Sequence, residues 1–374
     1  MANEREIFVC AGEASGDLYA AQVVRALRAM HPELSFWGAG GVALEEAGVV
    51  LRHRAEDLAV TGISELRKVA WAAGRLLLDS RHQLRRRRPA LALLVDYPGA
   101  NLRLAKMAKD AGVPVLYYVA PQRWAWLSWR LRGLRDDVDH LAAILPFEEP
   151  FFTSRGVKTT FVGHPLLDLH SEVDSVQVRR ELSPDNRPVL TLWPGSRPNE
   201  LEAHLPRLAS AAHRLKREFQ LLWVTTAPWA AQRCQQAFEG ARCVRPKDAL
   251  ALGRAVSSQV VALCCSGTAT LQLALAGVPL AVFYRMGAIS ALAARALLRV
   301  PYVALPNLIL GREVVPELLQ ERMTVHGLEG AAHTLMRPDV GARQRASFAE
   351  VRETLGGPGA GKRVAALALE LLER

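Results

Sequence analysis

Cysteine is scarce in this chain of 374 residues, and none of the five cysteines belongs to a C-x-x-C pair. Because most of them lie in apolar segments, we expect reduced, buried thiols instead of a disulfide framework. None of the ten histidines has the H-E-x-x-H spacing of a zinc site, so we expect no metal. These absences argue against a disulfide-stapled secreted module and leave a metal centre unsupported.

A long, purely apolar run is missing as well. The longest uncharged stretch, residues 255–284, is long enough to cross a bilayer, but serines, glycines, a glutamine and a proline interrupt it. Two buried strands around a short helix explain it better than a membrane span. The first residues turn polar after a short apolar run, so we expect no signal peptide and a cytoplasmic protein.

Lysine is also rare, since only seven of the 47 basic residues are lysine and 40 are arginine. The net charge of +10 at pH 7 predicts an anionic partner: a nucleic acid, an anionic membrane or a phosphorylated substrate. Arginine suits bidentate contacts with phosphate. No recognised nucleic-acid-binding module is visible, so we expect no nucleic acid, although a basic nucleic-acid-binding protein stays the non-enzymatic alternative.

Short apolar runs alternate with helical patterns along the chain, which predicts parallel sheets covered on both faces. We therefore expect an α/β fold with two doubly wound, Rossmann-like domains that face a central cleft. In such domains, ligands bind beside the carboxyl ends of the strands. The apolar runs that predict strands are residues 7–11, 91–95, 113–119 and 140–145, followed by 189–193, 219–225, 260–265 and 280–284.

A polar stretch separates the two halves of the pattern. We place the N-terminal domain at residues 1–168, a linker at 169–187 and the C-terminal domain at 188–355. The last helix, within residues 356–374, is expected to pack back on the N-terminal domain.

Two loops of the first half directly follow predicted strands. The first contains Glu13, Ser15, Gly16 and Asp17, where glycines and a serine before a helix can present N–H groups to an anion. A tight turn with a helix N-cap explains the same residues. In the second loop, Asp96 ends an apolar strand, where a carboxylate facing a cleft can act as a general base. The alternative is that Asp96 caps a helix, although Asn101 could serve there instead.

Two loops of the second half have a similar position between a strand and a helix. Both combine glycine with hydroxyl side chains, and the first adds an arginine fork, which suits a phosphate or diphosphate. Two such loops in one domain point to a nucleotide diphosphate. The candidate residues are Gly195, Ser196 and Arg197 in the first loop and Ser266, Gly267, Thr268 and Thr270 in the second.

Tryptophan and arginine cluster at two places that suit a membrane surface, because indole rings favour the headgroup region and cations favour lipid phosphates. The alternatives are core tryptophans and a solvated helix end. The candidate residues are Trp124, Trp126 and Trp129 in one cluster and Arg85, Arg86, Arg87 and Arg88 in the other.

The motifs AGEASGD, VDYPGANLRLAK, YYVAPQRWAW, LPFEEPFF, VGHPLLD, WPGSR, CSGTATLQLAL, VFYRMG and LPNLILGREVVPELLQ follow one another across nearly the whole chain. Together they resemble the lipid-A-disaccharide synthase family of inverting glycosyltransferases with the GT-B fold. The resemblance implies transfer of a 2,3-diacylglucosamine from UDP to the 6-hydroxyl of 2,3-diacylglucosamine 1-phosphate. The products are the β-1,6 disaccharide and UDP, and the enzyme is expected at the inner membrane.

The resemblance also assigns roles to residues. It implies that Asp96 deprotonates the attacking hydroxyl and that Arg197 and helix termini stabilise the leaving UDP without a metal or other cofactor. It places the nucleotide near residues 266–270. Further nucleotide-binding residues implied in this way are Gln272, Tyr284, Arg285, Asn307, Arg312 and Glu313.

Three residues depart from the family pattern. Gly99 replaces an acid, Ala120 replaces a serine, and Gln272 replaces a glutamate that commonly holds the ribose hydroxyls. A neutral glutamine should bind the ribose more weakly. The alternative enzyme is another UDP-sugar-dependent transferase or epimerase of the same fold. Members of the family can dimerise by exchanging C-terminal segments, so a homodimer stays open.

Overall fold

The computed structural model describes residues 3–55, 66–121, 131–169, 180–182, 187–256, 258–287 and 300–373. It divides into two compact units. Unit 1 contains Met1–Leu169 together with Leu355–Arg374, and unit 2 contains His170–Thr354. Each unit is described by itself. Within the described parts of the chain, no helix combines the length and the apolar content needed to cross a membrane.

Unit 1 is built on a seven-stranded parallel sheet in the order β3-β2-β1-β4-β5-β6-β7. Its central strands are buried on both faces, as continuous apolar sequences such as the one in β4 require. The strands are β1 (Asn3–Ala11), β2 (Ser35–Gly40), β3 (Val50–Arg54), β4 (Pro89–Val95), β5 (Val115–Tyr118), β6 (His140–Ala143) and β7 (Thr159–Phe161).

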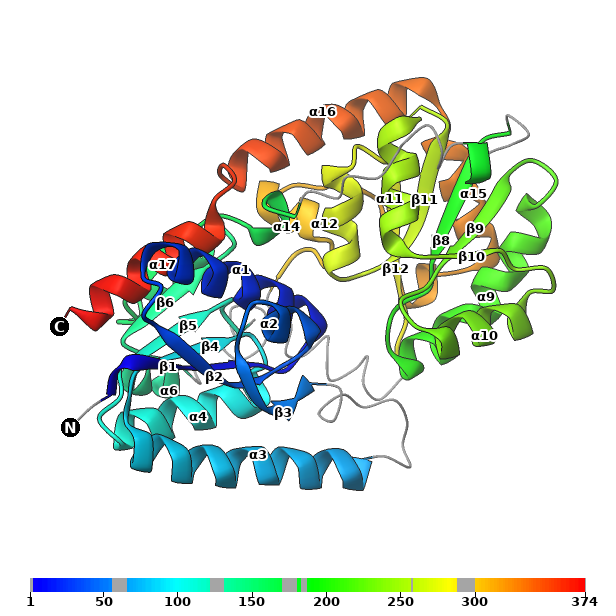
Figure 1. Ribbon diagram of the computed structural model, residues 1–374. Helices are drawn as coiled ribbons and strands as arrows, with labels where there is room; N and C mark the ends of the chain where they lie inside the picture. The colour runs from blue at the N-terminus through cyan, green and yellow to red at the C-terminus, as the bar shows by residue number, and fades with distance from the viewer. Residues whose placement is uncertain are drawn as a thin grey trace. The chain divides into compact units, whose positions relative to one another are not determined.

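Helices cover both faces of this sheet, with α3 and α4 on one side and α1 and α17 on the other (Figure 1). The chain returns from unit 2 to add α17, which packs against α1. The Asp168 carboxylate accepts hydrogen bonds from the N–H groups of Gly359 and Gly361 and so caps α17. The helices are α1 (Ala14–Met30), α2 (Val42–Glu46), α3 (Leu66–Arg87), α4 (Pro98–Asp110), α6 (Arg132–Asp137), α7 (Glu148–Thr153), the 3₁₀ turn η3 (Pro165–Leu167) and α17 (Ala360–Leu372).

Unit 2 repeats the design with a six-stranded parallel sheet in the order β10-β9-β8-β11-β12-β13. The strands are β8 (Val189–Trp193), β9 (Gln220–Val224), β10 (Cys243–Val244), β11 (Val260–Cys265), β12 (Leu280–Tyr284) and β13 (Glu317–Leu319). The helices are α9 (Pro198–Leu215), α10 (Pro228–Ala237), α11 (Pro246–Ala255), α12 (Thr268–Leu275), α14 (Leu305–Leu310), the 3₁₀ turn η4 (Gln320–Arg322), α15 (Val325–Leu335) and α16 (Pro338–Thr354).

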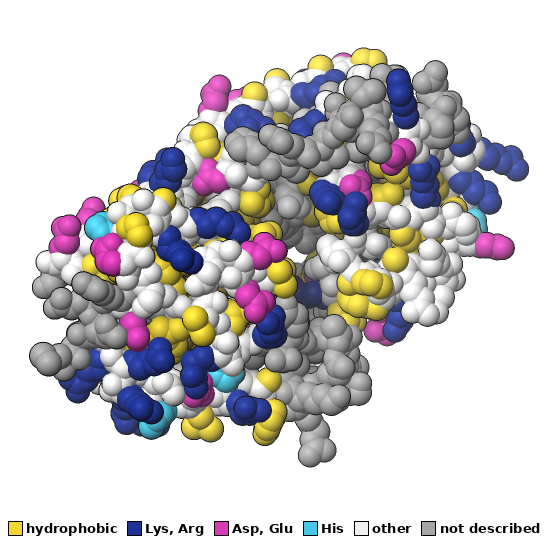
Figure 2. Space-filling view, viewed as in Figure 1, with side chains coloured by type: hydrophobic (Ala, Val, Ile, Leu, Met, Phe, Trp, Pro, Cys, Tyr) yellow, Lys and Arg dark blue, Asp and Glu magenta, His cyan; other side chains and the backbone are white. Residues whose placement is uncertain are grey.

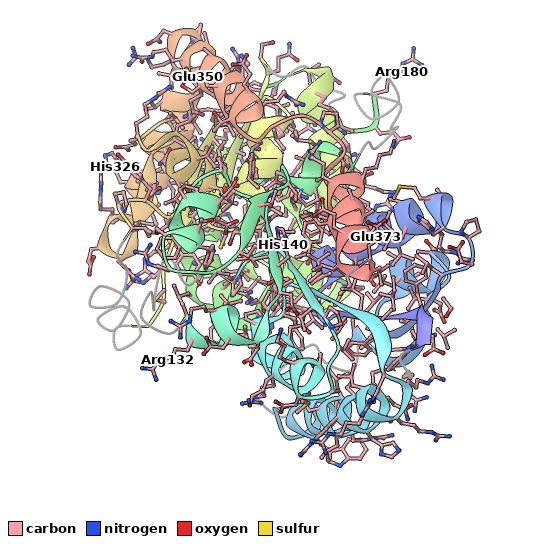
Figure 3. The ribbon with its side chains drawn as sticks, turned by 90° about the vertical axis from the view of Figure 1, so that its left-hand side faces the viewer. Arg132, His140, Arg180, His326, Glu350 and Glu373 are labelled. Atoms are coloured by element: carbon pink, nitrogen blue, oxygen red, sulfur yellow. The ribbon has the colours of Figure 1, made fainter. Side chains whose placement is uncertain are left out.

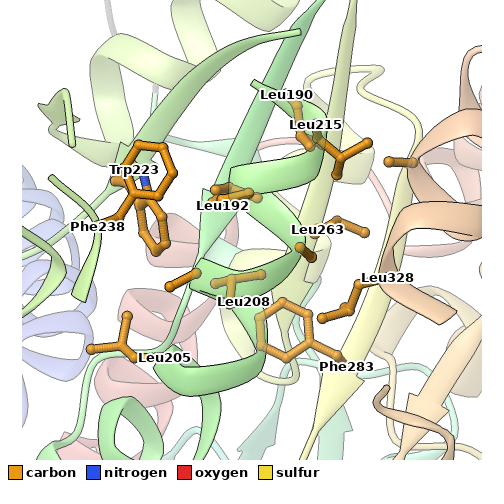
Figure 4. Close-up of a cluster of buried hydrophobic side chains, with 14 of the residues drawn as sticks. Leu190, Leu192, Leu205, Leu208, Leu215, Trp223, Phe238, Leu263, Phe283 and Leu328 are labelled. Carbon is orange, nitrogen blue, oxygen red and sulfur yellow. The ribbon is translucent and has the colours of Figure 1, made fainter. Parts of the chain in front are cut away.

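One face of the unit 2 sheet packs its side chains against α9 and α15 (Figure 4). Leu208 of α9 and Leu328 of α15 are fully buried there beside Phe283 of β12. Each such side chain stabilises the fold by roughly 1.5–3 kcal/mol through burial. This packing fixes the sheet and thereby the loops at its carboxyl edge.

In both sheets the strand order reverses once, between β1 and β4 in unit 1 and between β8 and β11 in unit 2. In open parallel sheets, ligands bind outside the carboxyl ends of the two strands at such a reversal. The predicted α/β class with parallel, doubly wound sheets is confirmed.

Candidate active site

In unit 1, the loops after β1 and β4 lie next to each other at the reversal point. Ala11 pairs with Val95 in the sheet, so the chain leaves both strands at the same level. A Cβ atom added to Gly16 would lie 3.7 Å from the Cβ of Asp96. The structure therefore brings together the two unit 1 loops that the sequence predicts to be functional.

Asp96 and Tyr97 form a strained turn directly after β4. Their φ angles are 50° and 48°, a left-handed conformation that residues other than glycine rarely adopt. Each costs on the order of 1–3 kcal/mol, so the surrounding structure must hold it. The Asp96 carbonyl accepts hydrogen bonds of 2.7 Å from both the Asn101 amide and the Tyr117 hydroxyl, and the Asp96 N–H donates to the Tyr118 carbonyl at 2.9 Å.

Gly12 leaves room for the second residue of this turn. A Cβ atom at Gly12 would lie 2.4 Å from ring atoms of Tyr97, much closer than van der Waals contact. The ring of Tyr97 therefore lies directly against the backbone of the first loop. This contact ties the two loops together and explains why glycine occupies position 12.

Asp17 and Asn101, two polar residues of the unit 1 loops, have structural roles. The Asp17 carboxylate is buried and accepts hydrogen bonds from the N–H groups of Gly41, Ala43 and Leu44, so it caps α2. Asn101 is fully buried, and its amide donates to main-chain carbonyls, including those of Val95 and Asp96. The hydrogen bonds of both residues fit a role in shaping the loops, and a contact of either with the acceptor stays a prediction. Glu13 is exposed, and Ser15 is half-buried.

A tyrosine and a histidine that the sequence did not suggest lie near this loop pair. Tyr19 on α1 is buried, and both burial and the charge of Asp96 raise its pKa. The rings of Tyr19 and His164 are in an edge-to-face contact. Burial lowers the pKa of the His164 imidazole to about 3. His164 is therefore neutral near pH 7, and its Nδ1 accepts a hydrogen bond from the Leu166 N–H.

In unit 2, the loop after β8 presents a serine and an arginine to solvent. Ser196 and Arg197 are exposed, and the Arg197 side chain lies 3.7 Å from the Glu200 carboxylate. The expected anion-binding N–H groups of Ser196 and Arg197 instead donate to Glu200, at 2.9 and 3.2 Å. Glu200 also fills the space where a Gly195 side chain would lie. The guanidinium and the serine hydroxyl are thus the groups that can contact an anion here.

The loop after β11 leaves its backbone open at Gly267. Gly267 has a φ of 142°, it is exposed, and no described atom beyond its chain neighbours lies within 4 Å of where its Cβ would be. Thr268 is exposed beside it and begins α12. The hydroxyls of Ser266 and Thr270 donate to the carbonyls of Val303 and Gly267, so they shape the loop. Gly267 and Thr268 are left facing solvent at the N-terminus of the helix.

His204 of α9 connects the β8 and β12 loops. Its Nδ1 lies 2.8 Å from the Pro194 carbonyl, and its Nε2 accepts a hydrogen bond of 3.0 Å from the Arg285 N–H. Arg285 also donates to the Gln320 carbonyl, and Tyr284 is half-buried next to it. His204 is not among the residues that the sequence predicted to be functional. Glu200 and His204 are polar residues on the buried face of an amphipathic helix, and that pattern could have indicated them.

Asn307 and Arg312 are engaged within unit 2. Asn307 is fully buried, its amide donates to Val315 and Glu317, and its oxygen accepts from the main chain. The Arg312 guanidinium donates a hydrogen bond of 2.6 Å to the carboxylate of Glu350 on α16. Figure 3 labels Glu350. The bonds of Asn307 show that it supports its loop, and its role in nucleotide binding stays a prediction. Glu313 is exposed.

Comparison with known proteins places this geometry in a family. A family profile described as lipid-A-disaccharide synthetase matches residues 7–363. The lipid-A-disaccharide synthase of Myxococcus xanthus is 41% identical over 382 residues, covering 100% of this chain and 99% of the relative. That of Trichlorobacter lovleyi is 37% identical over 385 residues, covering 99% and 98%. This chain belongs to the lipid-A-disaccharide synthase family.

This member of the lipid-A-disaccharide synthase family is therefore an enzyme, a glycosyltransferase of lipid A biosynthesis. The comparisons do not favour the alternative of a different UDP-sugar enzyme.

Distant solved structures share its fold. UDP-GlcNAc 2-epimerase from Neisseria meningitidis, bound to UDP-GlcNAc, has a TM-score of 0.61 at 12% identity, covering 99% of this chain and 100% of the other. MurG from Acinetobacter baumannii has a TM-score of 0.56 at 15% identity, covering 98% and 99%. At these identities the likeness shows the fold alone, and it agrees with the predicted GT-B type.

The three departures from the lipid-A-disaccharide synthase pattern lie in different surroundings. Gly99 lies at the exposed start of α4, and a side chain there would meet open space. The acidic side chain of the family pattern would therefore fit at this position without displacing a neighbour. Ala120 is buried just after β5, whereas Gln272 is half-buried on α12. Among the described residues, no three or more His, Cys, Asp or Glu side chains are grouped as a metal site would require.

The proposed membrane residues of this synthase are only partly described. Trp124, Trp126 and Trp129 lie outside the described residues. Arg85, Arg86 and Arg88 are exposed at the end of α3. Arg87 lies over the Trp37 ring, with its guanidinium carbon 4.9 Å from the ring centre, and is 3.5 Å from Glu6. Arg87 thus has partners within unit 1 but is exposed, and its contact with a membrane stays a prediction.

Proposed function

We propose that this enzyme joins two acylated sugars. It transfers 2,3-diacylglucosamine from UDP to the 6-hydroxyl of 2,3-diacylglucosamine 1-phosphate, giving the β-1,6 disaccharide and UDP. Membership in the lipid-A-disaccharide synthase family supports the reaction. The observation that carries the proposal is the strained turn at Asp96, which presents a half-buried carboxylate at the reversal point of the unit 1 sheet.

In the proposed mechanism, Asp96 acts as the general base. Its carboxylate accepts the proton of the acceptor 6-hydroxyl while the hydroxyl oxygen attacks the anomeric carbon of the donor sugar. The bond from that carbon to the UDP oxygen breaks on the opposite side, and its electron pair leaves with UDP. A single in-line displacement inverts the configuration, so no covalent intermediate with the enzyme forms.

We assign the leaving UDP to the two exposed loops of unit 2. The Arg197 guanidinium is suited to a phosphate oxygen, and Gly267 and Thr268 offer the open N-terminus of α12. Fixed positive charge at the leaving diphosphate stabilises the transition state. The proposal therefore needs no metal at the diphosphate, and turnover measured in excess EDTA tests this point.

We further propose that α3 contacts an anionic membrane surface. Trp71, Arg75 and Leu78 recur at helical spacing, and Trp71 and Leu78 are 64% and 71% exposed. The Arg75 guanidinium lies over the Trp71 ring, with its carbon 4.7 Å from the ring centre. Figure 2 shows basic and hydrophobic side chains side by side along the edge formed by α3. Apolar side chains interleaved with cations suit a peripheral contact with lipid.

Mass spectrometry of the product tests the proposed reaction. The enzyme is incubated with acylated UDP-glucosamine and acylated glucosamine 1-phosphate, and a tetraacylated disaccharide phosphate is expected together with UDP. A parallel incubation with UDP-GlcNAc separates this reaction from epimerisation. An epimerised UDP-sugar, or turnover of UDP-GlcNAc with no use of the acylated donor, would overturn the proposal.

A further inference from the structure

Tyr117 lies in β5, the strand next to β4, and Asp96 directly follows β4. Tyr117 is fully buried, and its hydroxyl donates a hydrogen bond of 2.7 Å to the Asp96 carbonyl. The same carbonyl accepts from Asn101 at 2.7 Å. Two buried side chains from different elements thus converge on the main chain of one residue, and that residue has a positive φ.

These two hydrogen bonds can stabilise the strained conformation of the turn at Asp96. A relaxed backbone at Asp96 would have a negative φ, and rotating φ swings the Cβ and the carboxylate with it. Bonds to the carbonyl oppose that rotation because they fix the peptide plane that follows Asp96. A general base requires close positioning, since a displacement of 1 Å can lower a rate by about 100-fold.

We propose that the Tyr117 hydroxyl is a positioning group for Asp96. It holds the left-handed turn in which the carboxylate reaches the acceptor hydroxyl, while Asn101 holds the same carbonyl from the start of α4. The inference rests on the proposed role of Asp96 as the base. Tyr117 itself contacts the main chain, so it acts through Asp96 and not on the substrate.

The neighbouring residue supplies a matched control. Tyr118 is also fully buried in β5, but among the described residues its hydroxyl has no hydrogen-bond partner. Tyr117→Phe and Tyr118→Phe each remove one hydroxyl from the same strand at the same burial. They differ in whether that hydroxyl holds the Asp96 turn.

The test compares kcat and KM of the full-length enzyme carrying each variant. For Tyr117→Phe we expect kcat to fall about 10–100-fold, with the KM for the UDP-sugar changed less than about 2-fold. For Tyr118→Phe we expect values close to wild type. UDP binding and the Tm of each variant show that the protein is folded. Equal kcat values for the two variants would overturn the inference.

A double mutant separates positioning from a general structural effect. If Tyr117 acts through the Asp96 carboxylate, adding Tyr117→Phe to Asp96→Asn lowers the residual turnover no further. If the two losses multiply, Tyr117 acts independently and the positioning role is refuted. Full turnover by Asp96→Asn would overturn the base assignment and, with it, this inference. Loss of turnover by Asp96→Asn with wild-type kcat in Tyr117→Phe would overturn only the inference.

Discussion

Polar side chains in and near the loops of the candidate site differ in whether they are hydrogen-bonded within the protein or exposed to solvent. The Arg197 side chain is 67% exposed, whereas Asn101 and Asn307 are fully buried and bonded to main-chain groups. An exposed guanidinium can bind a ligand at little desolvation cost. A buried amide bonded to the main chain holds the backbone around it. The first kind of residue should affect binding when changed, and the second should affect loop structure.

Replacing Asp96 with asparagine should leave only a small residual turnover, because an amide cannot accept the proton of the acceptor hydroxyl. General bases contribute roughly 10²–10⁴-fold, so we expect a loss of that size in kcat. UDP binding, measured by calorimetry, should change little, since the loops that we propose to bind the nucleotide belong to unit 2. Turnover retained within a few-fold of wild type would refute the role of Asp96.

Replacing Arg197 with alanine should weaken UDP binding by about 10–150-fold, as expected for losing a hydrogen bond to a charged group. Arg245 provides a control. It precedes α11 as Arg197 precedes α9, it pairs with an acid three residues on, and its side chain is 69% exposed. Arg245→Ala should leave the Kd for UDP unchanged, and an equal loss in both variants would contradict the assignment.

His164 should make stability depend on pH. Its pKa is lowered to about 3 by burial, whereas an unfolded histidine titrates near pH 6.5. Below pH 6.5 the unfolded state binds a proton that the folded state does not. Stability therefore falls as the pH drops toward 3, by about 1.4 kcal/mol per pH unit from this group.

Urea unfolding at pH 7, 6 and 5 measures this effect. His164→Gln should show a shallower decline than wild type over that range because the titrating group is gone. The same slope in both proteins would show that His164 is not the cause.

At the scale of elements, α3 carries both buried and exposed large apolar side chains. Its buried residues, such as Leu76 and Leu84, pack on unit 1, while Trp71 and Leu78 face solvent. A helix with large apolar side chains on its outer face needs a reason beyond packing. We propose an anionic membrane surface as that reason, since exposed arginines lie at the end of α3.

The double variant Trp71→Ser, Leu78→Ser should bind vesicles containing phosphatidylglycerol at least about 10-fold more weakly than wild type, because it removes two large apolar contacts with lipid. Val50→Ser on β3 is the control, since Val50 is 68% exposed but lies on a different element. Cosedimentation at low and high salt measures the binding. Undiminished binding by the double variant would exclude α3 as the contact.

At the scale of the whole molecule, unit 1 is built from two separate segments of the chain. After unit 2 is complete, residues 355–374 return to unit 1, and α17 covers α1 and strands β4 and β5. The stability of unit 1, and hence the Asp96 turn after β4, therefore depends on the last helix of the chain.

Ending the chain after Gly359 should destabilise unit 1 by about 5–9 kcal/mol, because the buried side chains of Val364, Leu367 and Leu371 are lost. A chain that ends at Leu372 keeps the helix and is the control. Differential scanning calorimetry should show a lower unfolding temperature for unit 1, while UDP still raises the Tm of unit 2. An unchanged thermogram for the shorter chain would contradict this.

Much of the fold could be predicted from local sequence. Continuous apolar runs such as Leu91–Val95 indicate strands buried on both faces, and the structure contains them within β4. The position of Asp96 and of residues 195–197 directly after such runs also identified the loops. The bonds of Asp17, Asn101 and His204 could not be predicted, since their partners include residues 24, 91 and 81 positions away.

The sequence by itself determined the alternation of strands and helices and the chemistry available at each loop, because periodicity and side-chain type are local properties. Only the tertiary structure decided that β1 lies beside β4 and β8 beside β11, which brings the loops together in pairs. It also decided which polar groups cap helices or hold the turn at Asp96 and which stay open to a ligand. Both outcomes depend on contacts between distant segments, and such contacts form only when the sheets and their helices pack.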